Sequence, residues 1–374
     1  MDLSRRELLT ASAALLASPK AAFAPAGVAL AAIGPSATQP IVLCWNENPY
    51  GPSPAARAVI NGTIPGACRY PDEEIDQLVE LLARNEGVSR EHIVVGSGSG
   101  ELLCALGLLH GRDGGEIIAA QPTYAELTNY AQTAGAALKF VPVDQQLNHD
   151  LPAMRAAVSA RTRAIYVCNP NNPTGTAVSA ASIRSFVGSL PDSVTTIVDE
   201  AYLDFADSDG VHTVADLVST GKRVVVLRTF SKIHGMAGVR CGYAIARPDV
   251  AAQIAAVRMA SPNIFAMRAA RASLGDAAFL ADTRRRIVAS RTRVTNTLQH
   301  LGLAYAKPQT NFVFFDTGAP LAQFDQFMKA RHILVGRLFP PYNNWCRITI
   351  GTEPEVDAFL QGLQAYGGKR AAAA

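Results

Sequence analysis

Residues 223–246 read RVVVLRTFSKIHGMAGVRCGYAIA, and this stretch decides the fold. Its first part, residues 224–227, is a run of valine and leucine, which is typical of a buried parallel strand. Lys232 follows that strand in a turn punctuated by glycine, and Arg240 comes eight residues later. Most lysines are solvated surface charges. In a cleft at the end of a strand, however, desolvation and nearby cations lower the pKa of a lysine, and its free amine can then attack a carbonyl group.

Strands and helices alternate on the N-terminal side of this stretch. Short apolar runs predict further strands at residues 93–95, 116–120, 137–143, 164–168 and 196–198. The alternation predicts an α/β fold, in which a mostly parallel sheet is flanked by helices on both faces. Ligands of such sheets bind at the carboxyl ends of the strands. The Gly-, Pro- and charge-rich segments lie at those ends: GSGSGELL (96–103), QPTYAEL (121–127), NPNNPTG (169–175), DEAY (199–202) and TFSK (229–232).

The pattern changes from about residue 262, where long helices run to residue 301. Shorter elements follow, with strands expected at 311–316, 333–335 and 345–350 and helices at 321–332 and 356–366. We expect these elements to form a smaller α+β domain. The chain then divides into an export signal and linker (1–40), an N-terminal arm that joins the small domain (41–70), a large domain (71–261) and the small C-terminal domain (262–374).

Composition narrows the function classes. The chain has 374 residues, 49% of them hydrophobic and 17% charged, as in an ordinary globular protein. A scattered net charge of +3 gives no reason to expect nucleic acid as a partner. The densest basic run, residues 284–286 with Arg291 and Arg293, is expected to be a solvated helix face. Six widely spaced cysteines without a CxxC motif predict buried thiols and no metal site.

The N-terminus has the features of a targeting segment. Arg5 and Arg6 precede an Ala- and Leu-rich run that reaches about residue 24, a pattern typical of a twin-arginine export signal. The run is too short for a stable membrane span and is interrupted by Pro19 and Lys20. We therefore expect a periplasmic protein. The alternative is a cytoplasmic protein whose N-terminus is an ordinary disordered segment.

Six motifs, taken in order, carry a resemblance to a known family. GSGSGELL, PTY, NPNNPTG, DEAY, TFSK with Arg240, and CRITIGT (346–352) resemble the motifs of fold-type I, pyridoxal-phosphate-dependent aminotransferases of class I/II, and especially the histidinol-phosphate aminotransferase group. The likeness spans roughly residues 43–367. It implies a large domain that binds pyridoxal 5'-phosphate and an enzyme that moves an amino group between small molecules. The expected donor is a glutamate-like amino acid, and the expected acceptor is a 2-oxo acid or a histidinol-phosphate-like compound.

The resemblance assigns roles around the cofactor's ring. Lys232 would form the Schiff base with the aldehyde and, once displaced by substrate, act as a base. Asp199 would face the ring nitrogen and keep it protonated. Tyr202 and Asn172 would donate hydrogen bonds to the ring's phenolic oxygen, and Tyr124 would stack on the ring. Taken singly, Asp199 could equally be a helix cap, Asn172 a turn residue and Tyr124 part of the core.

The cofactor's phosphate needs hydrogen-bond donors. Gly98 and Ser99 begin a predicted helix, whose N-terminal N–H groups and dipole favour an anion. The family's cradle also implies side chains at Thr229, Ser231 and Arg240. Tyr70 matches a tyrosine that reaches the phosphate from the neighbouring subunit, which implies a homodimer.

Arginine is the expected anchor for the substrate. Arg347, in CRITIGT, would grip a carboxylate with two parallel hydrogen bonds, although a structural ion pair is the alternative. Arg337 matches a second arginine that helps to bind anionic substrates, and Asn46, Glu47 and Asn48 resemble the family's substrate-side loop. The segment 338–345, LFPPYNNW, departs from the family in length and composition. In the family, this region lines the substrate pocket.

Two other functions fit the same motifs. A decarboxylase acting on an amino-acid phosphate, similar to threonine-phosphate decarboxylase, would use the same cofactor but break a different bond. A non-catalytic module would bind pyridoxal phosphate without turnover. Export also conflicts with histidinol phosphate as the substrate, because that compound belongs to a cytosolic pathway.

Overall fold

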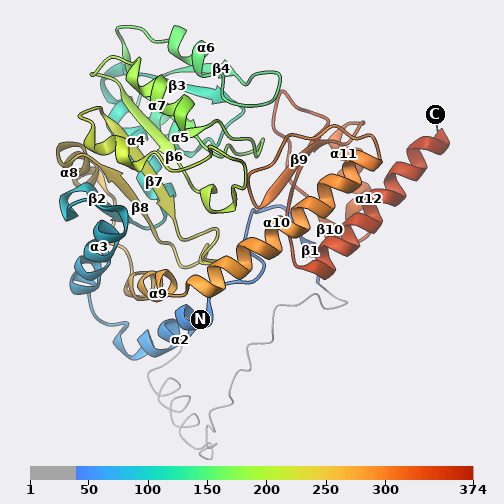
Figure 1. The fold of residues 1–374 in the computed structure, drawn as a ribbon, viewed down its shortest axis with the longest axis horizontal. Coiled ribbons are helices and arrows are strands. Elements are labelled where there is room, and N and C mark those ends of the chain that lie inside the picture. Colours follow the sequence, from blue (N-terminus) through green and yellow to red (C-terminus); the bar gives the residue numbers. More distant parts are fainter. Residues whose placement is uncertain (1–38, 374) are drawn as a thin grey trace, which may run out of the picture. The chain divides into compact units, whose positions relative to one another are not determined.

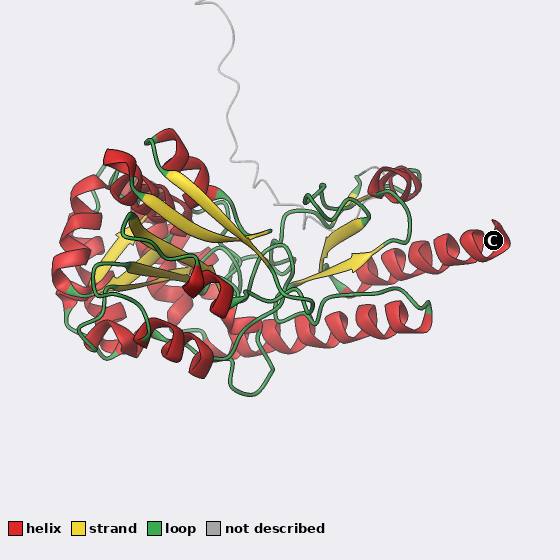
Figure 2. Cartoon of the chain, turned by 90° about the horizontal axis from the view of Figure 1, so that it is seen from above, coloured by secondary structure: helices red, strands yellow, loops and turns green. Residues whose placement is uncertain are grey.

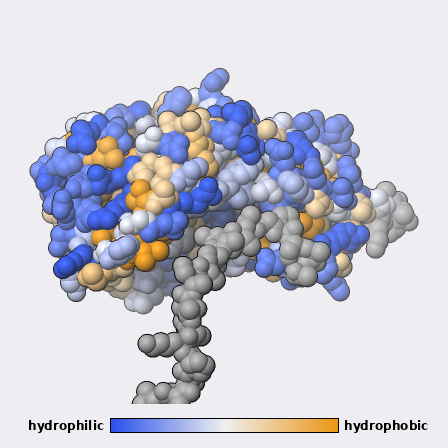
Figure 3. All heavy atoms as spheres, turned by 90° about the horizontal axis from the view of Figure 1, so that it is seen from below, coloured by the Kyte–Doolittle hydropathy of each residue, from blue (hydrophilic) through white to orange (hydrophobic). Residues whose placement is uncertain are grey.

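The computed structural model describes residues 39–373, and the predicted export signal lies outside the described residues. None of the described helices combines the length and apolar character needed to cross a membrane. On the face drawn in Figure 3, hydrophobic residues lie in small patches separated by hydrophilic ones. Such a surface is ordinary for a folded protein, because apolar atoms always contribute much of the accessible area.

The larger sheet has seven strands in the order β2-β8-β7-β6-β5-β3-β4 (Figure 1). Pairing is parallel throughout β7-β6-β5-β3-β4, whereas β8 is antiparallel to both of its neighbours. The mostly parallel α/β sheet predicted from the sequence is therefore confirmed. The strands are β2 (Ile93–Gly96), β3 (Glu116–Gln121), β4 (Ala137–Pro142), β5 (Thr162–Cys168), β6 (Thr195–Asp199), β7 (Val224–Thr229) and β8 (Gly242–Ala246).

Alternate residues along these strands face opposite sides of the sheet. Val95 and Val226 belong to one hydrophobic cluster and their neighbours Val94 and Val225 to another, as the two-residue period of a strand requires. Helices cover both faces (Figure 2). The first cluster packs under α3 (Asp72–Glu86), α6 (Leu151–Ala156) and α7 (Ala180–Gly188), and the second under α4 (Ser99–Gly111), α5 (Glu126–Thr133) and α8 (Pro248–Val257).

The smaller domain has its own core, built from phenylalanines and aliphatic residues such as Phe315, Phe324 and Phe359. The N-terminal segment contributes a strand to it, because β1 pairs in parallel with β10. Strands β9 and β11 form an antiparallel pair. The elements are β1 (Ile41–Val42), α10 (Ala277–His300), β9 (Phe312–Asp316), α11 (Leu321–Lys329), β10 (Ile333–Leu334), β11 (Trp345–Thr349) and α12 (Glu353–Ala373).

Two helices near the predicted domain boundaries pack with the larger core. Helix α9 (Ile264–Leu274) contacts α3 and α2 (Pro54–Thr63). Its buried residues Ala266 and Met267 share a cluster with the sheet strands, and so does Ala56 of α2. The prediction had placed α9 in the small domain and α2 in the arm. By packing, the small-domain core begins at α10.

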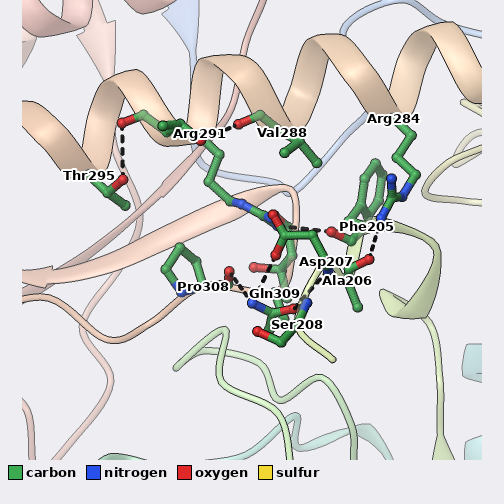
Figure 4. Close-up of polar contacts among 12 residues, drawn as sticks. Phe205, Ala206, Asp207, Ser208, Arg284, Val288, Arg291, Thr295, Pro308 and Gln309 are labelled. Carbon is green, nitrogen blue, oxygen red and sulfur yellow. Dashed lines mark hydrogen bonds and ion pairs between the residues drawn. The ribbon is translucent and has the colours of Figure 1, made fainter. Parts of the chain in front are cut away.

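Arg291 of α10 lies in the interior, which corrects the expectation of a solvated basic face at this residue. The residue is 3% exposed, and its side chain donates to the carbonyl oxygens of Phe205 (3.0 Å) and Thr310 (2.9 Å). It also forms an ion pair with Asp207 at 2.8 Å, and Gln309 accepts from the backbone of Asp207 (Figure 4). Arg291 thus ties α10 to the loop that follows β6, whereas Arg293 on the same helix is exposed.

Candidate active site

A cavity of about 280 Å³ lies where the carboxyl ends of the large-sheet strands meet the N-terminal arm and the small domain. Twelve residues predicted from the sequence line it: Asn46, Ser99, Tyr124, Asn172, Asp199, Tyr202, Thr229, Ser231, Lys232, Arg240, Arg337 and Arg347. These residues come from segments up to 300 positions apart in the sequence. The parallel sheet explains their meeting, because the ends of its strands lie along one edge.

Lys232 follows β7 and reaches into this cavity. Its Nζ donates to the carbonyl oxygen of Asn46 at 3.0 Å and lies 5.3 Å from the centre of the Tyr202 ring. Desolvation, and then the nearby guanidinium of Arg347, lower the pKa of Lys232 to about 8. About half of this amine is therefore unprotonated at pH 8, where it is available as a nucleophile or base.

Asp199 is the last residue of β6 and is 2% exposed. Burial raises the pKa of Asp199 to about 6. Two donors oppose this shift: the hydroxyl of Tyr166 binds Oδ2 at 3.0 Å, and the backbone N–H of Ala201 binds Oδ1 at 3.1 Å. The carboxylate is thus held by fixed hydrogen bonds and can balance a cationic ring nitrogen.

Tyr166 was missed from the sequence, although a signal was present. It lies in β5 among apolar residues and is completely buried. A buried tyrosine hydroxyl generally has a hydrogen-bond partner. Strand β5 pairs in parallel with β6, and Cys168 lies opposite Asp199. The partner of the Tyr166 hydroxyl was therefore to be expected on β6.

Two amide side chains connect the remaining polar groups. Asn46 Nδ2 donates to the Tyr202 hydroxyl at 3.1 Å, and Arg347 Nη1 donates to Asn172 Oδ1 at 2.6 Å. Since Oδ1 of Asn172 already accepts from arginine, its amide nitrogen is the group available to donate to a ligand. Burial raises the pKa of Tyr202, so its hydroxyl keeps its proton and can act as a donor.

A phosphate-sized anion would find donors at the start of α4. Gly98 caps this helix at φ 86°, and a Cβ at this position would lie 2.5 Å from Nη2 of Arg240. Arg240 itself has φ 67° and donates through Nη1 to the Ala237 carbonyl oxygen at 2.8 Å. Gly242 likewise leaves room for the backbone N–H of Ser99. Glycine at these positions lets the guanidinium approach the helix N-terminus, where an anion binds favourably.

The two hydroxyls predicted for the same cradle lie side by side. Thr229 Oγ1 donates to Ser231 Oγ at 3.0 Å and accepts from the backbone N–H of Ser231 at 3.1 Å. Together with Arg240 and the start of α4, they form a donor set that fits a phosphate dianion. With Lys232 and Asp199 in the same cavity, the residues present fit pyridoxal phosphate.

Arg347 lies in β11 and is 7% exposed. Besides Asn172, it donates through Nη2 to the Cys44 carbonyl oxygen at 2.8 Å, while its buried Nε has no hydrogen-bond partner. Its hydrogen-bond acceptors are thus neutral oxygens, and within residues 39–373 it forms no ion pair of the kind considered as the alternative role for this arginine. Its positive charge is available to a substrate carboxylate, and Arg337 lines the same cavity.

Four predicted residues do not line the cavity in the described chain. Asn48 is buried and donates to the carbonyl oxygen of Ile233 at 2.8 Å, so it ties the N-terminal arm to the turn that carries Lys232. Glu47 is exposed, and its charge opposes the lowering of the Lys232 pKa. Gly98 acts through the space it leaves for Arg240. Tyr70 is 89% exposed, and its role in a neighbouring subunit stays a prediction.

Several lining residues were not predicted, among them Trp45, Thr123, Cys168 and Phe339. Behind the cavity, the buried Asn311 donates through Nδ2 to the carbonyl oxygens of Asn46 and Glu47, both at 3.1 Å. In the sequence, the position of this asparagine directly before the apolar run 312–315 was the signal for a polar residue at the start of a buried strand. Across residues 39–373, no group of three or more His, Cys, Asp or Glu residues could hold a metal ion.

Comparison with known proteins agrees with this geometry. The family model for aminotransferases of class I and II matches residues 38–363. A histidinol-phosphate aminotransferase from Moorella thermoacetica is 36% identical over 328 residues, which cover 87% of this chain and 84% of that protein. An aromatic amino acid aminotransferase from Rhodococcus jostii is 40% identical over 324 residues, or 86% of this chain and 88% of that protein.

A similar protein of known structure was solved with the cofactor bound. The crystal structure of histidinol-phosphate aminotransferase from Sinorhizobium meliloti in complex with pyridoxal-5'-phosphate has a TM-score of 0.81 to this chain at 27% identity. The match covers 88% of this chain and 92% of that one. The chain therefore belongs to the class I and II aminotransferases, a family of enzymes that depend on pyridoxal phosphate.

Proposed function

We propose that this aminotransferase uses Lys232 as the covalent anchor of pyridoxal phosphate and transfers an amino group from a glutamate-like donor to a 2-oxo acid or a histidinol-phosphate-like acceptor. One observation carries the proposal: a single cavity brings together the amine of Lys232, the carboxylate of Asp199 and the guanidinium of Arg347. When bound, the cofactor supplies an electron sink for the substrate's bonding electrons.

The protein's own side chains would transfer the proton, balance the charge of the ring and orient the substrate. Lys232 Nζ, whose pKa is lowered to about 8, can take up and return a proton near neutral pH. Asp199 would provide the negative charge opposite the ring nitrogen, and Tyr202 and Asn172 would donate hydrogen bonds at the opposite edge of the ring. Arg347 would hold the substrate's carboxylate in a fixed orientation.

The reaction can be tested on purified holoenzyme. A set of amino donors and 2-oxo acids should show conversion of the bound cofactor's absorption band, followed by transfer of the amino group. Carbon dioxide release without transfer would identify a decarboxylase instead. An absorption band that no donor converts would identify a binding module.

The role of Lys232 needs a separate experiment. Borohydride reduction should attach the cofactor irreversibly to the wild-type chain at residue 232. Lys232→Ala should carry no such label and should lose multiple turnover. Lys222→Ala, which changes a surface lysine paired with Asp192, is the matched control and should label normally. Labelling of Lys232→Ala equal to that of wild type would refute the assignment.

The proposal extends to the assembly of two chains into a homodimer. Because Tyr70 is 89% exposed and lies outside its own cavity, we infer that it completes the phosphate site of a second subunit in a homodimer. Mixed dimers of Tyr70→Phe and Lys232→Ala chains should then recover activity that neither variant has alone. A sedimentation mass of one chain for the active enzyme would oppose this inference.

We also infer export to the periplasm through residues 1–40, on the basis of Arg5 and Arg6. The twin-arginine route suits an enzyme that must fold around its cofactor before it crosses a membrane. A reporter fused to residues 1–40 should reach the periplasm, and an Arg5→Lys, Arg6→Lys variant should not. A reporter that stays in the cytoplasm would favour the cytoplasmic alternative.

A further inference from the structure

Phe339 lies between β10 and β11, in the segment whose composition departs from the family. Its ring is 8% exposed and contacts two guanidinium groups at once. The ring centre lies 4.9 Å from Cζ of Arg337 and 5.0 Å from Cζ of Arg347. Because the face of an aromatic ring carries negative potential, it attracts cations at this distance. One side chain therefore supports both arginines of the substrate pocket.

The position of this ring is fixed by a small aromatic cluster. Phe314 of β9 packs edge to face against Phe339, with ring centres 6.1 Å apart. Tyr342 closes the turn through a backbone hydrogen bond to the Phe339 carbonyl oxygen at 2.9 Å and also packs on Phe314. Trp345 covers Phe314 at 4.9 Å. The ring cannot move without disturbing these contacts, so it is a rigid support for the two guanidinium groups.

The two arginines present positive charge that no acidic side chain neutralises. Within the described residues, Arg337 has the Phe339 ring as a partner but no hydrogen bond or ion pair. Arg347 donates to an amide oxygen and a backbone carbonyl oxygen, both neutral. Two like charges on one ring repel each other. Their arrangement is therefore most favourable when a ligand brings compensating negative charge.

We propose that Phe339 is a positioning and specificity-determining residue, whose ring holds Arg337 and Arg347 together so that the pair prefers doubly negative substrates to monocarboxylates. A second carboxylate and a phosphate monoester share this chemistry. The inference depends on the proposed function only in placing substrate in this cavity. Leucine at this position would fill the apolar space but lack the ring's negative face. Arg337, which is exposed, would then be free to turn into solvent.

Binding to the holoenzyme tests the inference without turnover. Three probes represent the three classes of anionic ligand: maleate for dicarboxylates, phenyl phosphate for phosphate monoesters and 3-phenylpropionate for monocarboxylates. Phe339→Leu should weaken binding of maleate, phenyl phosphate or both about ten-fold, because two cation–ring contacts are lost. Binding of 3-phenylpropionate should change less than about three-fold. The probe that responds more strongly identifies the kind of anion recognised.

Two further variants separate specificity from packing. Phe339→Tyr keeps the ring and should bind maleate and phenyl phosphate as wild type does. Phe324→Leu removes a buried ring of the small-domain core that packs against Phe315 and Tyr366 rather than against either arginine, and it should leave the binding ratios unchanged.

The inference would be overturned if Phe339→Leu weakened binding of all three probes equally. It would also be overturned if Phe324→Leu weakened binding of maleate and phenyl phosphate as selectively as Phe339→Leu does. Such a result in an enzyme that still transaminates would leave the proposed function intact. Selective loss of binding to the doubly charged probes in a protein that transfers no amino group would instead support the role of Phe339 and defeat the proposed function.

Discussion

The hydroxyl of Tyr166 donates a 3.0 Å hydrogen bond to Oδ2 of Asp199, and both side chains are almost completely buried. The bond joins neighbouring parallel strands, β5 and β6, near their carboxyl ends. It stabilises the ionised form of a carboxylate that burial would otherwise protonate. Four other titratable groups contribute to the electrostatics around Asp199: Tyr124, Cys168, Tyr202 and Lys232.

Tyr166→Phe should shift the acidic limb of the pH–activity profile. Loss of a hydrogen bond to the charged form raises the pKa of Asp199 further above its ordinary value, so the carboxylate protonates at higher pH. The acidic limb of kcat/KM should move up by roughly one to two pH units, since hydrogen bonds to charged groups contribute about 1.5–3 kcal/mol.

A second buried tyrosine provides the control for this change. Tyr243 in β8 donates to Glu86 at 2.6 Å and does not line the cavity. Tyr243→Phe should therefore leave the acidic limb where it is in wild type. If both variants gave the wild-type profile, Tyr166 would have no influence on the ionisation of Asp199.

Asp199→Asn should stabilise the cofactor-free protein at alkaline pH while abolishing efficient catalysis. Burial raises the folded-state pKa of Asp199 from 3.8 to about 6, so the folded state binds this proton more tightly than the unfolded state. The resulting stability is complete below the unfolded-state pKa and is lost as pH rises through about 6. Asparagine removes this dependence, because it does not titrate.

Urea denaturation of the two cofactor-free proteins would measure the difference. The free energy of unfolding of Asp199→Asn should exceed that of wild type by about 3 kcal/mol at pH 8. Near pH 4, where the folded wild-type carboxyl is protonated, the two should nearly coincide. A difference independent of pH would mean that the ionisation of Asp199 is not the cause.

Arg347→Lys should raise KM for dicarboxylic donors far more than it changes the absorption of the bound cofactor. Lysine cannot reproduce a two-pronged grip on a carboxylate or reach both Asn172 and the Cys44 carbonyl oxygen. Loss of charge-assisted hydrogen bonds worth about 1.5–3 kcal/mol corresponds to roughly a 10- to 100-fold higher KM. An unchanged KM would show that Arg347 is structural.

Arg291→Ala should destabilise the fold without acting on the substrate. The change leaves Asp207 and two carbonyl oxygens without their buried partner (Figure 4). We expect the free energy of unfolding to fall by about 3 kcal/mol. Arg293→Ala, on an exposed face of the same helix, should cost less than about 1 kcal/mol. Equal losses in the two variants would contradict the central role of Arg291.

Much of the site could be predicted because a parallel sheet leaves little freedom in where its loops meet. Once the alternation of strands and helices was recognised, Lys232, Asp199 and Asn172 had to lie along one edge. The family motifs then supplied their roles. The short strand β8 was missed because its five residues follow a glycine-rich turn, and its antiparallel place between β2 and β7 depends on pairing with strands far away in sequence.

The sequence by itself determined the sheet, the edge at which ligands bind and the residues that meet there, because the period of apolar residues and the positions of glycine and proline act locally. The tertiary structure alone decided that Tyr166 binds Asp199, that Phe339 lies against two arginines and that Arg291 is buried while Arg293 is not. A side chain's type states which contacts it can make. Its partner is chosen by packing between segments that are distant along the chain.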